Sequence, residues 1–301
     1  MEKNRFEKIL SPYREQVDSA LVELSGSRPE NIPLRLWESM TYSLLAGGKR
    51  IRPILCLLSA GACGVSKNDA MVMALACEMV HTASLIHDDL PAMDNDILRR
   101  GKPTNHVIFG EPLSLIAGDA LFLWAFEFAL EGLAKRNKFQ PETIMAAVSE
   151  LLKAAGPKGI CGGQVLDSDP ESTLSTEEHP WRVAFSKTAS LIRASVLSGV
   201  VLGETDEETR SAFSAYGEHL GMAFQIVDDI IDVTGSKSEL GKTPGKDSEQ
   251  GKITFVAAFG MEKARQLAAR ETSLASRAIS RVNGETDLLA SLPGTLLDRS
   301  I

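Results

Sequence analysis

Acidic residues are concentrated in a short segment that follows a long apolar run. The segment "LIHDDLPAMDNDILRRGKPTNH" covers residues 85–106 and contains Asp88, Asp89, Asp94 and Asp96. Carboxylates this close together raise the free energy of the fold unless a cation lies among them. Acidic residues at a helix end are usually solvated, so the cluster alone is weak evidence for a bound metal ion.

A second acidic cluster occupies a similar position later in the chain. The segment "FQIVDDIIDVTG" places Asp228, Asp229 and Asp232 at the end of another apolar run. Asp228 and Asp232 are four positions apart and therefore share one helical face. Mg²⁺ is usually held by one or two carboxylates together with substrate phosphates. Two such clusters at the ends of apolar helices are better explained by a metal site than by a solvated surface.

The first cluster has a spacing that a regular helix does not bring together. Asp88 and Asp94 are six positions apart, which corresponds to about 120° around an ideal helix. Pro91 lies between them and disrupts a regular helix. The sequence therefore predicts that the chain leaves the helix here and returns Asp94 toward Asp88.

Basic residues follow both acidic clusters and a Gly-Gly pair, and one more lies in "FSKTAS". If their side chains converge on the acidic clusters, the site combines two acidic platforms with several cations. Such a site suits two diphosphate groups, one held through metal and the other mainly by Lys and Arg. The basic residues concerned are Lys49, Arg50, Arg52, Arg99, Arg100, Lys187, Lys242, Lys246 and Lys252.

Long helices are the elements expected to position these residues. Strand signals are nearly absent, and apolar residues recur on more than one face, which is typical of helices buried inside a large bundle. Asn68 or Asp69 is the expected N-cap of the helix that leads to Asp88, and Pro53 suits a first helical turn. We expect one all-α domain over residues 1–301. Helical patterns cover residues 37–45, 52–63, 68–87, 112–134, 141–156, 188–203 and 207–233, with breaks at 25–33, 98–112, 156–181 and 234–252.

Composition narrows the class of protein. The 301 residues are 44% hydrophobic with a net charge of −8, and no basic stripe suggests nucleic acid as a partner. No uninterrupted apolar stretch reaches about 18 residues, so no membrane-spanning helix is expected. Cys56, Cys63, Cys77 and Cys161 lack metal-ligand spacing and are expected to be reduced thiols. With an N-terminus that lacks a signal-peptide pattern, this favours the cytosol.

The motifs together resemble those of the trans-isoprenyl diphosphate synthases, the family of farnesyl and geranylgeranyl diphosphate synthases. "GGKRIRP", "DDLPAMD", "AGDAL", "GGQVLD", "KTASLI", "FQIVDDIID" and "LGKTPGKD" appear in that family's order and cover nearly the whole chain. The resemblance implies the isoprenoid synthase fold, a single large bundle of long antiparallel helices around a central cavity. It also implies a Mg²⁺-dependent homodimer, with three ions in each site, that joins isopentenyl diphosphate to an allylic diphosphate.

The resemblance also implies a role for each matched residue. Ser186 departs from the pattern, because many family members have His there, which puts a minor contact in doubt. The implied metal ligands are Asp88, Asp94 and Asp228, supported by Asp89 and Asp232. Arg99, Lys187, Lys242 and Lys252 would bind the allylic diphosphate, and Lys49, Arg52, His81 and Arg100 the isopentenyl diphosphate. Thr188 and Gln225 would lie near the cationic carbon, with Gln164 and Asp167 in support.

His81 has two interpretations. A lone His on an apolar helix is usually a core residue. Here it lies seven positions before Asp88, nearly two turns along the same side of the helix. The resemblance favours a role as a ligand of the substrate.

Product length is predicted from the residues upstream of Asp88. In the family, bacterial farnesyl synthases with a similar acidic motif commonly have an aromatic residue at the position of Ala83. Ala83 and Ser84 are small, which favours the twenty-carbon geranylgeranyl product over the fifteen-carbon farnesyl product. Val80 lies further along the same path. Phe122, Trp124 and Phe126 are candidates for a deeper floor.

Two other classes of function remain as alternatives. Non-catalytic subunits of heteromeric synthases typically lose part of an aspartate motif, whereas both motifs are intact here. Terpene cyclases share the ionisation chemistry but generally lack elements such as "GGKRIRP" and "GKTPGKD" for a second diphosphate. The sequence therefore favours a synthase over both.

Overall fold

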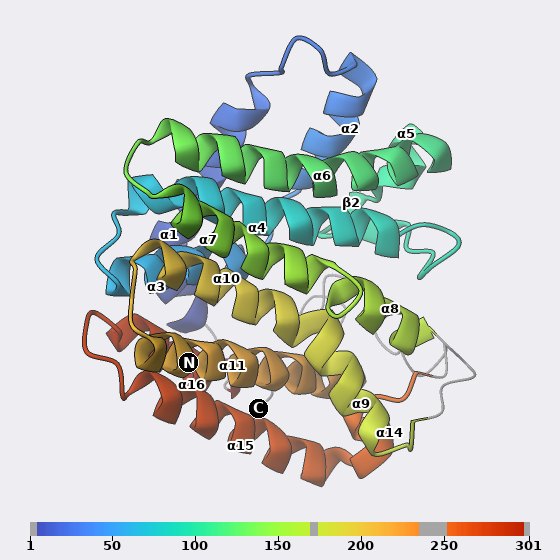
Figure 1. The fold of residues 1–301 in the computed structure, drawn as a ribbon. Coiled ribbons are helices and arrows are strands. Elements are labelled where there is room, and N and C mark those ends of the chain that lie inside the picture. The colour runs from blue at the N-terminus through green and yellow to red at the C-terminus, as the bar shows by residue number, and fades with distance from the viewer. Residues whose placement is uncertain (1–4, 169–173, 235–251, 298–301) are drawn as a thin grey trace.

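The computed structural model describes residues 5–168, 174–234 and 252–297 (Figure 1). The predicted all-α architecture is confirmed, and the long helices lie side by side in a layered bundle. The helices of the N-terminal half are α1 (Arg5–Ser25), α2 (Leu34–Leu44), α3 (Ile51–Ala62), α4 (Lys67–Asp88), α5 (Asn105–Phe109), α6 (Glu111–Lys135) and α7 (Pro141–Ala155). The C-terminal half has α8 (Ile160–Ser168), α9 (Glu178–Val183), the π-helical turn η1 (Ala184–Ala189), α10 (Ser190–Leu202), α11 (Glu207–Thr234), α14 (Phe255–Phe259), α15 (Met261–Ile279) and α16 (Asp287–Leu297).

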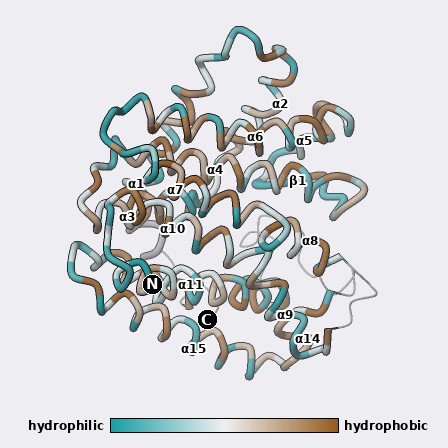
Figure 2. The backbone as a smooth tube through the Cα atoms, viewed as in Figure 1, coloured by the Kyte–Doolittle hydropathy of each residue, from teal (hydrophilic) through white to brown (hydrophobic). Residues whose placement is uncertain are grey.

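The core is centred on α10, where nearly every side chain is buried. It packs against α3, α7 and α11, while α4 packs against α6 and α11 against α15. Figure 2 shows hydrophobic residues recurring along these inner helices. A helix that is apolar on all sides is stable only when other helices surround it, which explains the layered arrangement.

The helix that leads to the first acidic cluster is α4. Its N-cap is Ser66, whose Oγ accepts a hydrogen bond from the Asp69 backbone N–H, so the expected cap at Asn68 or Asp69 was wrong. The helix ends at Asp88, close to Pro91, which disfavours helical geometry in the residue before it. The end of α4 therefore fixes where the first acidic cluster begins.

Two of the predicted breaks were too long. Within residues 98–112, a short antiparallel hairpin pairs β1 (Leu98–Arg99) with β2 (Lys102–Pro103), and α5 follows directly. Its two turn residues, Arg100 and Gly101, both have positive φ values of 54° and 75°. Within residues 156–181, α8 carries the "GGQVLD" motif. The last predicted break lies almost entirely at residues 235–251, outside the described part of the chain.

Three helical segments are long and apolar enough to span a membrane by length and composition alone, although no uninterrupted apolar run predicted one. They are α4, α6 and the continuous helix Glu178–Leu202. In α4 and in Glu178–Leu202, 72% of the apolar window is buried inside the bundle, whereas in α6 only 33% is. Of these three segments, α6 therefore has the largest share of its apolar window exposed.

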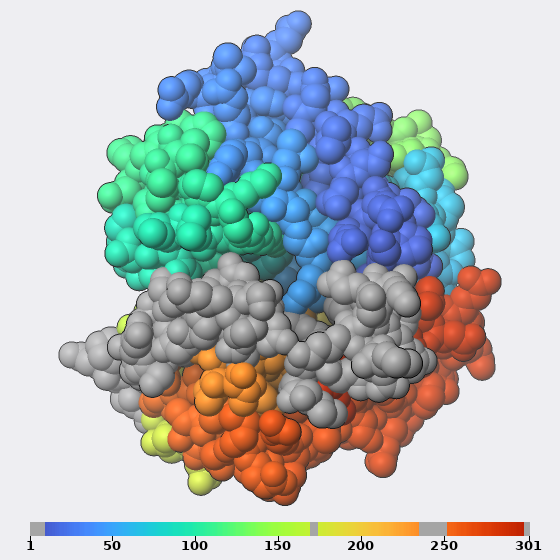
Figure 3. All heavy atoms as spheres, turned by 180° about the vertical axis from the view of Figure 1, so that it is seen from behind, coloured from blue at the N-terminus to red at the C-terminus, as the bar shows by residue number. Residues whose placement is uncertain are grey.

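The outer helices of the two halves of the chain lie at different ends of the molecule, while α10 packs between them. Seen from behind, the N-terminal helices form the upper part, and the segments coloured orange and red, which include α15 and α16, form the lower part (Figure 3). The ends of α4 and α11 carry the two acidic clusters, so the site is built from both halves.

Candidate active site

A cavity of about 700 Å³ lies between the two halves. Its volume falls in the range typical of small-molecule sites. Carboxylates from both clusters line it, namely Asp88, Asp94 and Asp96 from the first and Asp228 and Asp229 from the second. The predicted convergence of the two acidic clusters is therefore present in the structure.

The first cluster turns back as its spacing predicts. The Asp94 backbone N–H donates to the Asp88 carbonyl oxygen at 2.9 Å, which places both residues at the cavity edge. Asp89 is not part of the cavity lining, is 4% exposed and accepts a hydrogen bond from Arg99 Nε at 2.6 Å. Burial raises the pKa of Asp89 to about 6, against the opposing effect of Arg99.

The second cluster is organised around Asp229, to which the sequence assigned no role. Its carboxylate accepts hydrogen bonds from Gln225 Nε2 and from the Phe255 backbone N–H, each at 2.8 Å. Gln225 Oε1 in turn accepts from Thr188 Oγ1 at 2.6 Å. The predicted pair Thr188 and Gln225 is thus oriented by a buried carboxylate one position beyond Asp228.

The cavity carboxylates suit a metal ion that is shared with a ligand. Within the described residues, no three His, Cys, Asp or Glu side chains are close enough to hold an ion by themselves. Mg²⁺ held by one or two carboxylates and substrate phosphates does not need such a trio. The donor set, all hard oxygen ligands facing one cavity, fits Mg²⁺ on those terms.

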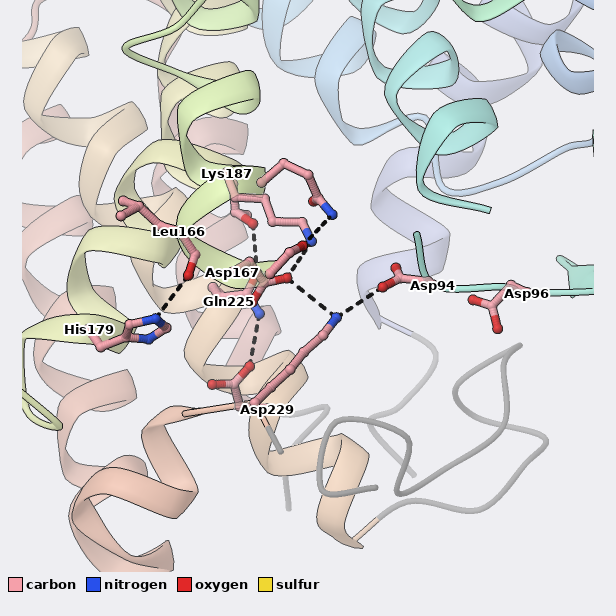
Figure 4. A network of polar contacts seen from close by, with 12 residues as sticks. Asp94, Asp96, Leu166, Asp167, His179, Lys187, Gln225 and Asp229 are labelled. Carbon is pink, nitrogen blue, oxygen red and sulfur yellow. Dashed lines mark hydrogen bonds and ion pairs between the residues drawn. The ribbon is translucent and has the colours of Figure 1, made fainter. Parts of the chain in front are cut away.

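A cluster of lysines and aspartates connects the two sides of the cavity. Lys187 Nζ lies 2.6 Å from Asp167, and Lys252 Nζ lies 3.2 Å from Asp94 and 3.3 Å from Asp167. Figure 4 shows Asp94 and Asp96 on one side and Asp167, Lys187 and Asp229 on the other. Burial raises the pKa of Asp167, but Lys187 and Lys252 outweigh it and hold this pKa below its usual value.

The close contact between α8 and η1 depends on a glycine. A Cβ added at Gly163 would lie 2.3 Å from the Lys187 backbone nitrogen, so only glycine allows this approach. Lys187 and Thr188 both lie in η1, and π-helical turns frequently occur at functional sites. The "GGQVLD" motif therefore brings Asp167 to Lys187.

The Gly-Gly turn before α3 places a second group of cations on the cavity wall. Lys49, Arg52 and Arg100 all line the cavity. Arg100 donates to the Gly47 carbonyl oxygen, and a Cβ at Gly48 would lie 2.5 Å from its guanidinium carbon. Burial lowers the pKa of Arg52 to about 10, so its side chain stays charged at neutral pH.

His81 lies among these cations. Burial, together with the charges of Arg52 and Arg100, lowers its pKa well below the usual value. At neutral pH the imidazole is therefore uncharged, and it offers hydrogen bonds to a ligand. It lines the cavity, as expected for a ligand-binding residue.

Some predicted residues do not reach the cavity wall. Asp89, Asp232 and Gln164 are absent from its lining, and so are the small residues Ala83 and Val80. Of the residues used to predict product length, only Ser84 faces the cavity directly. Lys242 and Lys246 lie outside the described residues.

Sequence reasoning also missed a buried acid on the cation side. Glu78 is 1% exposed, lines the cavity and pairs with Arg50 at 2.5 Å. The available signal was a single charged residue within the apolar run "MVMALACEMVH". A charge in that position is stable only when a partner of opposite charge reaches it.

Comparison with known proteins identifies the family. Residues 34–285 match the polyprenyl synthetase family. The chain belongs to this family. Its members are prenyltransferases, and the predicted class of enzyme is confirmed.

Two plant proteins and one solved structure illustrate the similarity. The chain is 45% identical to the large subunit 1 of a heterodimeric geranylgeranyl pyrophosphate synthase from Arabidopsis thaliana, over 81% of this chain and 67% of that one. It is 46% identical to a chloroplastic geranylgeranyl pyrophosphate synthase from Catharanthus roseus, over 78% and 66% respectively. The Helicobacter pylori geranyltransferase, solved with magnesium and isoprenyl diphosphate, superimposes with a TM-score of 0.80 at 32% identity and covers 96% of both chains.

Proposed function

We propose that this polyprenyl synthetase condenses isopentenyl diphosphate with an allylic diphosphate to give geranylgeranyl diphosphate. The observation that carries the proposal is a single cavity with carboxylates from two helix ends and two separate groups of cations. One diphosphate requires metal and lysine, and the other requires mainly Arg and Lys. The names of the plant relatives support the twenty-carbon product.

On the allylic side, Asp88, Asp94 and Asp228 would hold Mg²⁺, with Asp89 and Asp232 in support, and we propose three ions in each site. Bound Mg²⁺ neutralises the charge that develops on a leaving diphosphate. Arg99, Lys187, Lys242 and Lys252 would bind the same diphosphate. In the ligand-free cavity, Lys252 contacts Asp94 and Asp167, so the incoming diphosphate would replace carboxylate oxygens around its ammonium group.

On the isopentenyl side, Lys49, Arg52, His81 and Arg100 would bind the second diphosphate. The uncharged imidazole of His81 would donate a hydrogen bond while the three cations supply the charge. Because the diphosphate is bound by its own group of residues, the isopentenyl group is free to approach the allylic carbon.

The reaction follows from this arrangement. The allylic carbon–oxygen bond breaks, and its electron pair leaves with the diphosphate. The Gln225 side-chain oxygen, oriented by Thr188 and Asp229, would stabilise the allylic cation. The double bond of isopentenyl diphosphate forms the new carbon–carbon bond, and a proton then passes to the released diphosphate. Apolar walls exclude the water that would otherwise trap the cation.

One assay tests the proposal. Purified protein with Mg²⁺, isopentenyl diphosphate and farnesyl diphosphate should yield geranylgeranyl diphosphate on chromatography. A main product of fifteen carbons from shorter allylic substrates would indicate the alternative, a farnesyl synthase. A cyclic hydrocarbon would indicate a cyclase, and no turnover would indicate a non-catalytic subunit.

We also propose that the chain forms a homodimer through α6. Ile116, Leu123 and Leu130 recur every seven residues along this helix and are 53%, 72% and 41% exposed. This spacing gives an apolar stripe of the kind that pairs helices. The Leu123→Lys variant should sediment as a monomer, whereas the wild type should sediment as a dimer. A wild-type monomer at micromolar concentration would contradict the proposal.

The proposed compartment is a reducing one, since all four cysteines are free. The cytosol is our first choice. The plant relatives, whose names place them in chloroplasts, make the chloroplast the alternative.

A further inference from the structure

The cavity wall includes one cation from a helix that precedes the matched family region. Arg14 lies in α1, which ends at Ser25, whereas the family match begins at residue 34. Its half-buried side chain lines the same cavity as Lys49 and Arg52. Neither the family motifs nor the roles derived so far use this residue.

A network of ion pairs fixes α1 to the isopentenyl side. Asp18, also in α1, accepts a hydrogen bond from Arg50 Nε at 2.8 Å. Arg50 additionally contacts Glu78 at 2.5 Å and the Leu44 carbonyl oxygen at 2.7 Å. Because Arg50 is the residue next to Lys49, this network joins α1 to the turn that carries the proposed diphosphate-binding lysine.

The position of Asp18 determines where Arg14 lies. The two residues are four positions apart, so they share one face of α1 and are about 6 Å apart along its axis. Once Asp18 is held against Arg50, the Arg14 side chain is directed to the neighbouring part of the cavity wall. The observed lining by Arg14 agrees with this geometry.

The charge balance at the Gly-Gly turn before α3 allows a further cation to take part in binding an anion. The charge of Arg50 is matched by Glu78 and Asp18, so Arg50 contributes little to binding an anion. Lys49, Arg52 and Arg100 are the other cations on this part of the wall. A diphosphate carries several negative charges that need compensation in a partly dry cavity.

We propose that Arg14 is a further binding residue for the diphosphate of the isopentenyl substrate and that the Asp18–Arg50 ion pair positions it. The proposal rests on the proposed function of the cavity. It assigns to α1 a part in substrate binding, in addition to its packing against α3, α4 and α16.

Calorimetric titration of isopentenyl diphosphate into the full chain, without allylic substrate, tests the proposal. Arg14→Gln should weaken binding about tenfold or more, the lower end of the usual effect of losing one hydrogen bond to a charged group. Arg14→Lys should retain most of the affinity. The KM for the allylic diphosphate should change less than about twofold in both variants, because that substrate binds mainly through metal and other lysines.

A matched control removes a different cation that contacts α1. Lys67 Nζ lies 4.4 Å from the centroid of the Tyr13 ring and is exposed, away from the cavity. Lys67→Gln should leave the affinity for isopentenyl diphosphate unchanged. An equal loss in Lys67→Gln and Arg14→Gln, or no loss in Arg14→Gln, would overturn the assignment. A wild type that binds no isopentenyl diphosphate would instead refute the proposed function.

Discussion

At the scale of single residues, the aspartates of each motif differ in what they face. Asp88 and Asp228 line the cavity, whereas Asp89 and Asp232 are buried beside it. We predict that Asp88→Ala and Asp228→Ala each reduce kcat at least about 100-fold, since each removes a ligand of the charge-stabilising metal. Glu131→Gln, at an exposed carboxylate on α6, is the control and should keep wild-type kcat. Near-normal turnover in either folded aspartate variant would refute the metal assignment.

Lys49 tests whether the two diphosphates have separate sites. Lys49→Ala should raise the KM for isopentenyl diphosphate about tenfold or more, because a charge-assisted contact to that group is lost. The KM for the allylic substrate should move much less. Steady-state kinetics with each substrate varied in turn measures both constants. Equal shifts would mean that Lys49 does not distinguish the two sites.

Some of the cavity residues were expected from the sequence, and others were not. Asp88, Asp94 and Asp228 and the cations Lys49, Arg52 and Arg100 were expected from the sequence to converge, and all six line the cavity. Glu78 was not expected there, because its burial depends on an ion pair with Arg50, a residue of the turn before α3. The roles of Lys242 and Lys246 stay predictions.

At the scale of elements, the apolar helices between residues 37 and 233 were predictable, whereas the long helices α1 and α15 and several short helices were not. Apolar residues on several faces identified α4, α10 and α11. The helix α8 was missed because paired glycines lower helix propensity, yet Gly163 is needed for its contact with η1. The β1–β2 hairpin was missed because Arg-Gly is not a common turn pair. In both cases a tertiary contact outweighs the local preference.

Product length is a property of α4. Ala83 is fully buried and Ser84 faces the cavity, so large residues at these positions should act differently. We predict that Ser84→Phe shortens the main product from twenty to fifteen carbons by blocking the growing chain. Ala83→Tyr should do the same once its ring displaces neighbours toward the cavity. Chromatography of the products measures both.

A conservative change at another cavity position of α4 provides the control. Leu85→Met changes shape without adding a ring, and the product should keep its length. A wild type that already stops at fifteen carbons would place the floor elsewhere and would contradict the role given to Ala83. Phe122, Trp124 and Phe126 on α6 are the candidates for the deeper floor of a twenty-carbon product.

At the scale of the whole molecule, α11 and α15 are joined by a titratable pair. His219 Nδ1 lies 2.7 Å from the buried carboxylate of Glu271, which raises the pKa of His219 despite the opposing effects of burial and Arg270. Glu218 adds to the increase. Because the pKa of His219 is higher in the folded state, its protonated form stabilises the fold. This contribution is fully present below the unfolded-state pKa of about 6.5 and is lost as pH rises through the folded-state pKa.

The prediction is that His219→Gln lowers the free energy of unfolding by roughly 1–3 kcal/mol at pH 6 and by less at pH 9. Urea unfolding of wild type and variant at both pH values measures the difference. Equal destabilisation at the two pH values would show that the charge of His219 contributes nothing. The expectation that residues 1–301 form one domain also stays a prediction.

The π-helical turn η1 has a consequence for how activity could be lost in evolution. Its i→i+5 bonding encloses one more residue than an α-helical turn, and Lys187 and Thr188 both lie within it. Deleting one codon within residues 184–189 would restore a regular helix and rotate the preceding segment by about 100° relative to α10. The core around α10 would persist while Asp167 and Lys187 lost their alignment. A deletion of one residue in η1 could therefore give a protein that keeps the fold but lacks catalytic activity.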